Sequence, residues 1–190
     1  SSHFRSAKRW YRGLDIEGQQ AYGWLGKYMD LHHAEKPWMG IDITNEICSE
    51  LLVGEHLSGI PWRGLKILKN VTANPYFQKF NVWGPDSHDA AHQHIYRTLS
   101  NSFLSADYLR EKEGDTNRNA DYPGSNHLAR DLKQVADLVV SGAETRVFYV
   151  MQGGYDTHRN QPVMQHRALK QFAEALAAFR ADLIRNNRWK

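Results

Sequence analysis

The feature that most constrains the fold is a helix–strand–helix pattern in the last third of the chain. Asn126 stands where its side chain can cap a helix, and Gly142 stands where a left-handed residue would end it. Between them, apolar residues recur at steps of four, three and four, which is the spacing of one helix face: Leu128, Leu132, Val135 and Val139. The sequence therefore predicts a helix between Asn126 and Gly142.

A buried strand and a second helix follow this first helix. Residues 146–151 form a continuous β-branched and aromatic run, which favours a strand covered on both faces by helices. Pro162 suits the first turn of the next helix, because a missing backbone N–H costs nothing there. The apolar stripe of that helix consists of Leu169, Phe172, Leu176, Phe179 and Leu183. The order of helix, strand and helix predicts a parallel α/β sheet.

The first third of the chain carries two helical patterns and then loses regularity. We expect a short helix over residues 4–12 that the segment Gly13–Gly18 ends, and a glycine-punctuated helix over residues 22–29 that packs closely on a flat surface. From residue 37 to residue 85, glycines and prolines interrupt short apolar runs. This pattern indicates short strands and loops.

A further helix and a polar loop precede the last third of the chain. Asp86 or Ser87 can cap a helix that carries an apolar face at steps of four, made of Ala91, Ile95, Leu99 and Phe103. Residues 111–122 contain too few apolar side chains for anything but a loop.

Composition and charge exclude several classes of protein. A chain of 190 residues with 41% hydrophobic residues is long enough to bury one sizeable core. The 24 basic and 21 acidic residues are spread along the whole chain, without the basic stripe that follows a nucleic-acid backbone. No stretch approaches the apolar length needed to cross a bilayer, so we expect no membrane span. The single cysteine, Cys48, cannot form an internal disulfide and has no CxxC partner for zinc.

The residues directly after the predicted strand form the candidate site. Ligands of open α/β sheets bind at the carboxyl ends of the strands, where this chain places Gly153 and Gly154 and then Asp156 and His158. The glycines permit a sharp turn, and the carboxylate oxygen and the imidazole nitrogen can bind one divalent metal. His166, in the early turns of the last helix, is either a third metal ligand or a residue that contacts the ligands Asp156 and His158. A simpler interpretation has equal weight: Asp156 caps the helix and His158 faces solvent.

Other chemically active side chains support weaker hypotheses. A histidine cluster near the start of the third helix contains an i, i+4 pair that could bind a metal, but a solvated surface is the favoured interpretation: His88, His92 and His94. The adjacent His32 and His33 diverge, which disfavours a shared ion. Ser2 stands at a helix start, where free N–H groups can stabilise an anion, and a simple cap is at least as good an interpretation.

Several motifs together resemble a bacterial family called domain of unknown function 1501. The resemblance is specific over roughly the last third of the chain, where it consists of Tyr122-Pro123, Leu132 through Ala136, the Gly153–His158 turn, Asn160-Gln161, His166 and Leu176 through Leu183. The segments Ser2-His3-Phe4 and Gly23 through Tyr28 are similar to the middle region of the same family. Residues 35–121 match it only loosely.

The resemblance implies a fold and an activity. The family is grouped with the alkaline phosphatase and sulfatase superfamily, whose α/β sheet holds one or two divalent metals through Asp and His side chains. It therefore implies a metal-dependent hydrolase of small phosphate or sulfate esters, with Asp156 and His158 as metal ligands and Ser2 as the nucleophile. Kinship also implies a periplasmic or cell-surface location. The metal, the substrate and the oligomeric state stay open.

The resemblance also implies that this chain holds only part of such a domain. We predict that residues 1–190 belong to one alkaline phosphatase-like domain with a mostly parallel sheet flanked by helices. Residues 35–121 would be an irregular, insertion-like region, and residues 122–184 the helix–strand–helix module. The chain begins without Met and ends just after a helical pattern, so we expect a fragment with half a site. The competing hypothesis is a binding or scaffold protein that keeps the fold without turnover.

Overall fold

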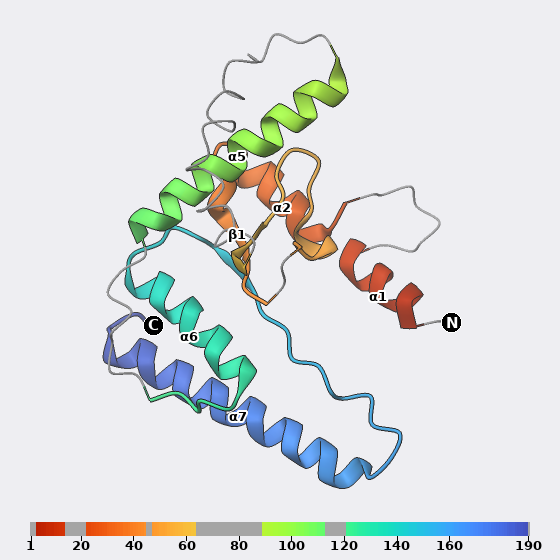
Figure 1. The fold of residues 1–190 in the computed structure, drawn as a ribbon, viewed down its shortest axis with the longest axis vertical. Coiled ribbons are helices and arrows are strands. Elements are labelled where there is room, and N and C mark those ends of the chain that lie inside the picture. The colour runs from red at the N-terminus through yellow and green to blue at the C-terminus, as the bar shows by residue number, and fades with distance from the viewer. Residues whose placement is uncertain (1–2, 14–21, 45–46, 64–88, 113–120, 190) are drawn as a thin grey trace. The chain divides into compact units, whose positions relative to one another are not determined.

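The computed structural model describes residues 3–13, 22–44, 47–63, 89–112 and 121–189 (Figure 1). These residues belong to two compact units. Unit 1 comprises Ser1–Arg110 and Thr145–Val147, and unit 2 comprises Glu111–Glu144 and Phe148–Lys190. The chain has a mixed α/β structure with a small parallel sheet of three strands, as the sequence predicts in outline.

Unit 1 contains helices, short 3₁₀ turns and the first two strands. In chain order its elements are α1 (His3–Arg12), α2 (Trp24–His33), η1 (Pro37–Met39), β1 (Gly40–Asp42), η2 (Glu50–Leu52), β2 (Ile60–Pro61) and α5 (Ala90–Lys112), whose last two residues belong to unit 2. α1 ends at Gly13, which has a φ of +69°, as expected for a C-terminal glycine. The predicted caps Asp86 and Ser87 lie outside the described residues, and Asp89 caps α5 by accepting a hydrogen bond from the Ala91 N–H at 2.8 Å.

The parallel sheet has the strand order β2–β1–β3, with β3 at Val147–Tyr149. β1 and β2 run parallel, with Ile41 opposite Ile60. All three residues of β1 are buried, because β1 is the central strand. The general prediction of a parallel α/β sheet is confirmed.

β3 is shorter and less buried than the sequence predicts. It covers residues 147–149 instead of 146–151, and each of its residues is half-buried. Just before it, the Arg146 N–H donates a hydrogen bond to the Met39 carbonyl oxygen at 3.0 Å, and the Thr145 hydroxyl donates one to the Trp38 carbonyl oxygen at 2.8 Å. β3 is an edge strand of the described sheet, and its half-buried residues are less covered than expected for a strand with helices on both faces.

α2 packs against the backbone that follows η2, as its glycines predict. A Cβ atom on Gly26 would lie 2.3 Å from the backbone of Val53 and Gly54, and one on Gly23 would lie 2.2 Å from the carbonyl oxygen of Glu50. The Gly23 N–H donates a hydrogen bond to the Val53 carbonyl oxygen at 2.8 Å. The absence of these two side chains therefore lets the start of α2 touch the neighbouring chain directly.

α5 is buried toward its C-terminal end in the described structure. Ile95 is 53% exposed and Ala91 is exposed, Leu99 and Phe103 are half-buried, and Ser105, Ala106 and Leu109 are buried. The ring of Tyr108 stacks on that of Trp38, with centroids 4.4 Å apart and planes 12° apart. α5 is thus anchored through its C-terminal half, where Ala106 and Leu109 continue the predicted apolar face at helical spacing.

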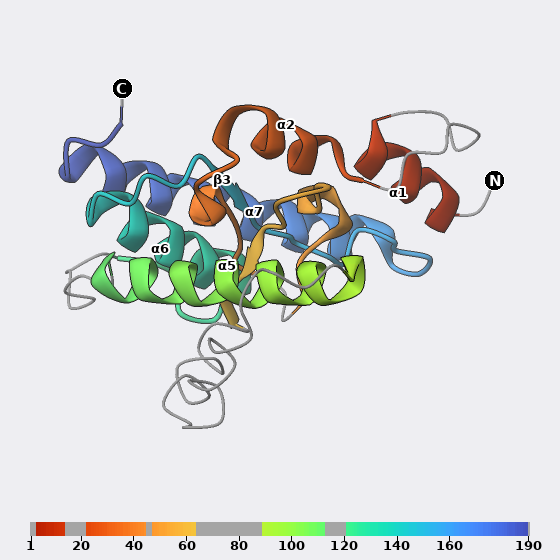
Figure 2. The same ribbon diagram turned by 90° about the horizontal axis from the view of Figure 1, so that it is seen from above.

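Unit 2 is built on α6 (His127–Val140) and α7 (Gln161–Arg185), which lie side by side in both views (Figures 1 and 2). The Asn126 side chain caps α6 by accepting a hydrogen bond from the Ala129 N–H at 3.3 Å, and its amide donates one to the Gln171 carbonyl oxygen of α7 at 2.6 Å. Gly142 has a φ of +78° just after the helix. The predicted cap and the predicted stop are both confirmed.

α7 begins as predicted, with Pro162 in its first turn, and packs along one edge of its predicted apolar stripe. Its buried residues are Ala168, Ala175, Asp182 and Leu183, whereas Leu169, Phe172 and Leu176 are 57%, 42% and 41% exposed. The fully buried Ala175 packs with Leu128, Ala129 and Leu132 of α6, and Phe179 of the predicted stripe packs against the same cluster. Small alanines beside the stripe let the two helices approach closely.

Candidate functional site

The turn between β3 and α7 brings together two of the predicted site residues. Asp156 Oδ1 lies 3.0 Å from His158 Nε2, and their side chains are 76% and 85% exposed. Gly154 has a φ of +90°, which an L side chain rarely adopts, so this glycine is needed for the turn. Two residues apart in sequence, the carboxylate and the imidazole thus converge on one point of the surface of unit 2.

Residues before and within the pair attach the turn to α7 and to itself. The Gln152 amide donates a hydrogen bond to the Ala168 carbonyl oxygen at 3.0 Å, and the Tyr155 hydroxyl donates one to Gln152 Oε1 at 3.2 Å. The Thr157 N–H donates a hydrogen bond to the Tyr155 carbonyl oxygen at 3.0 Å. Thr157 Oγ1 is buried, and no partner for it lies among the described residues.

The interpretation of Asp156 as a helix cap is wrong. The N-cap of α7 is Asn160, in a left-handed conformation, and it makes no side-chain capping bond. Asp156 stands four residues earlier and pairs with His158 instead. The Asp156 carboxylate thus does not cap the helix, and it remains accessible to a ligand.

The geometry of the pair suits two ligands of one metal ion. Ligand atoms about 2.0–2.2 Å from a divalent ion and at ordinary bond angles lie about 2.8–3.6 Å from each other. The Asp156–His158 separation falls within this range. His166 is exposed on α7, and within the described ranges no group of three His, Cys, Asp or Glu side chains converges. Ser2, the predicted nucleophile, lies outside the described residues.

The other histidines do not form a metal site in the described part of the chain. His32 and His33 sit with Tyr28 at one end of α2, and their two rings are 6.4 Å apart. His92 pairs with Asp89 at 3.6 Å, while His88 lies outside the described residues. His94 lines a separate cleft on α5.

One acidic residue at a strand end escaped the sequence prediction. Asp42 is fully buried at the carboxyl end of the central strand β1, and its carboxylate accepts hydrogen bonds from the N–H groups of Thr44 at 3.1 Å and Ser49 at 2.9 Å. The alternation of Ile41 and Ile43 around it is the strand signal that could have found it. These bonds hold the loop after β1.

Burial, together with the nearby Asp42 carboxylate, raises the pKa of the Cys48 thiol to about 12. A thiol in this state carries little thiolate, which is the nucleophilic form. We expect iodoacetamide at pH 8 to alkylate Cys48 in the folded chain at least about 100-fold more slowly than in urea. Mass spectrometry of the modified fraction over time measures both rates, and equal rates would contradict the raised pKa of this half-buried thiol.

Comparisons of the chain with models of protein families, with curated proteins and with solved structures found no match. The resemblance to domain of unknown function 1501 and the alkaline phosphatase-like fold therefore stay predictions. Among the described residues, no helix combines the length and the hydropathy needed to cross a membrane.

Proposed function

We propose that the chain belongs to a metal-dependent hydrolase of phosphate or sulfate esters, in which Asp156 and His158 bind one divalent cation. The observation that carries the proposal is the 3.0 Å separation of Asp156 Oδ1 and His158 Nε2 at the turn after β3. An oxygen and an imidazole nitrogen together suit zinc, manganese and related ions. The high exposure of both side chains leaves room for an ester beside them.

Asp156 and His158 have different roles in this proposal. Asp156 supplies a negative charge that neutralises part of the charge of the cation, and His158 supplies a neutral nitrogen that fixes its position. The bound metal would polarise the ester oxygen and stabilise the charge that develops on it. Ser2 is the proposed nucleophile on the strength of the resemblance alone.

Two protein ligands are fewer than the three of a usual catalytic metal site. His166 is the histidine of α7, and no hydrogen-bond partner for its imidazole lies among the described residues. The described structure does not bring it together with Asp156 and His158. We propose that its side chain, in the second turn of the helix after the site, turns toward them to become the third ligand when a cation binds. Further ligands would come from outside the described residues or from another polypeptide.

Hydrolysis of aryl esters tests the proposal. The full-length polypeptide that carries this chain is assayed with p-nitrophenyl phosphate and p-nitrophenyl sulfate, with and without Zn²⁺ or Mn²⁺. We expect turnover of one of these esters only with added metal, and loss of that turnover in Asp156→Ala. Turnover that persists in Asp156→Ala would contradict the role of this carboxylate. Metal binding without turnover of either ester would refute the hydrolase and favour the scaffold hypothesis.

A further inference from the structure

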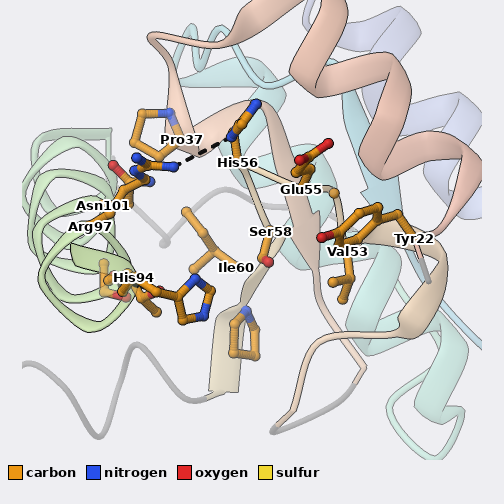
Figure 3. A pocket seen from close by; sticks show the side chains of 15 residues that line it. Tyr22, Pro37, Val53, Glu55, His56, Ser58, Ile60, His94, Arg97 and Asn101 are labelled. Atoms are coloured by element: carbon orange, nitrogen blue, oxygen red, sulfur yellow. Dashed lines mark hydrogen bonds between the residues drawn. The ribbon is translucent and has the colours of Figure 1, made fainter. Parts of the chain in front are cut away.

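Unit 1 contains a cleft of about 540 Å³ between α5 and the segment of residues 53–61 (Figure 3). One wall is a single face of α5, where spacings of three and four residues bring together His94, Arg97, Thr98, Asn101 and Ser102. The opposite wall is backbone and apolar surface from Val53, Ile60 and Pro61. All residues that line the cleft belong to unit 1, so the cleft is separate from the Asp156–His158 pair.

Arg97 and His56 meet at one end of the cleft (Figure 3). Arg97 Nη1 lies 3.4 Å from His56 Nδ1. Because arginine only donates hydrogen bonds, Nδ1 is the acceptor and the imidazole carries its proton on Nε2. Both groups therefore keep donors for a ligand, since the guanidinium has four further N–H bonds and the imidazole has its Nε2–H.

The loop that carries His56 is held firmly in place. The Asp30 carboxylate of α2 accepts hydrogen bonds from the N–H groups of Glu55 at 2.6 Å, His56 at 3.3 Å and Leu57 at 2.7 Å. The Gly54 N–H closes the loop with a bond to the Leu57 carbonyl oxygen at 2.7 Å. A preorganised loop loses little entropy when a ligand binds, which favours affinity.

The remaining polar groups of the α5 wall divide into donors and acceptors. The hydroxyls of Thr98 and Ser102 donate to helix carbonyl oxygens at 2.8 Å and 2.7 Å, so they offer only lone pairs to the cleft. His94 extends from α5 into the cleft, and no partner for its imidazole lies among the described residues (Figure 3). The charged or imidazole donors to a ligand are therefore Arg97, His56 and His94, beside the neutral amide of Asn101 and the hydroxyls of Tyr22 and Ser58.

The charge and the shape of the cleft together select one ligand class. Arg97 is its fixed cation among the described residues that line it, and Glu55 on the facing loop carries a negative charge that opposes any anion and opposes a dianion about twice as strongly as a monoanion. Val53, Ile60 and Pro61 provide apolar surface for the rest of the molecule. We propose that this cleft binds a small organic monoanion, namely a carboxylate with an apolar body, through Arg97 and His56.

Titration of the whole chain with benzoate, followed by ¹H–¹⁵N NMR spectra, tests the proposal. We expect saturable shifts of the amide signals of residues 53–61 and 94–102, with phenol causing none and phenyl phosphate binding more weakly than benzoate. Arg97→Ala should weaken benzoate binding roughly tenfold to a hundredfold, since a hydrogen bond to a charged group contributes this much. The matched control is Arg110→Ala, which removes an exposed arginine of the same helix that pairs with Asp107 at 3.1 Å.

The results of this titration distinguish benzoate binding in the cleft from metal binding at Asp156 and His158. Benzoate binding that is unchanged in Asp156→Ala supports an independent site in unit 1. No saturable shift in the cleft, an Arg97→Ala variant that binds like the wild type, or tighter binding of phenyl phosphate than of benzoate would overturn the proposal. A matching loss in Arg110→Ala would show that the effect is a general one of charge, which would overturn it as well.

Discussion

Gly26→Ala should lower the free energy of unfolding of unit 1 by roughly 2–3 kcal/mol. Alanine inside a helix gains up to about 1 kcal/mol over glycine from propensity alone, so a simple helix would become more stable. Here the new Cβ atom would lie 2.3 Å from the Gly54 nitrogen and from the Val53 carbonyl carbon. Both atoms are backbone and cannot move aside like the end of a side chain, and overpacking of this kind costs about 3 kcal/mol. Urea unfolding followed by tryptophan fluorescence measures the difference.

Gly124→Ala is the matched control for this prediction. No atom of the described residues lies within 4 Å of the Cβ that it would add, and its φ is not in the left-handed region. We expect its unfolding free energy to stay within about 0.5 kcal/mol of the wild type, as for most surface substitutions. If Gly26→Ala proved as stable as this control, the close contact between α2 and the chain at Val53 would be refuted.

Asp156→Ala and His158→Ala should each weaken binding of Zn²⁺ at least about 100-fold. Loss of a group that merely orients a metal ligand already costs about 10–100-fold, and loss of one of the three proposed ligands removes a direct bond. His127→Ala is the control, because His127 is an exposed histidine of the same unit whose imidazole contacts Arg130. Isothermal titration calorimetry measures all three affinities against the wild type. Equal affinities in the four proteins would place the metal elsewhere.

Local signals in the sequence were enough to predict the helices of unit 2. Asn126 and Gly142 mark the two ends of α6 through short-range bonds and a left-handed φ, which depend on few neighbours. The turn after β3 is equally local, because Asp156 and His158 stand two residues apart and meet without help from the rest of the chain. Helix caps and tight turns depend on residues that are close together in the sequence, and the structure contains the ones named here.

Features that depend on distant partners were not predictable in the same way. Hydrophobicity indicated that Leu169, Phe172 and Leu176 face the core, but close packing against α6 selects the edge of the stripe beside Ala168 and Ala175. The central strand β1 is only three residues long and owes its place to pairing with β2 and β3, which no short-range pattern specifies. Tertiary contact decides both cases, and one sequence alone does not reveal which surfaces meet.

Diffraction at the zinc absorption edge, from crystals of the chain grown with Zn²⁺, locates the cation that the proposed function requires. We predict an anomalous peak about 2.0–2.2 Å from both Asp156 Oδ1 and His158 Nε2, the distance of zinc from such ligands. A zinc peak bound to other residues, with Asp156 and His158 still paired to each other, would contradict it.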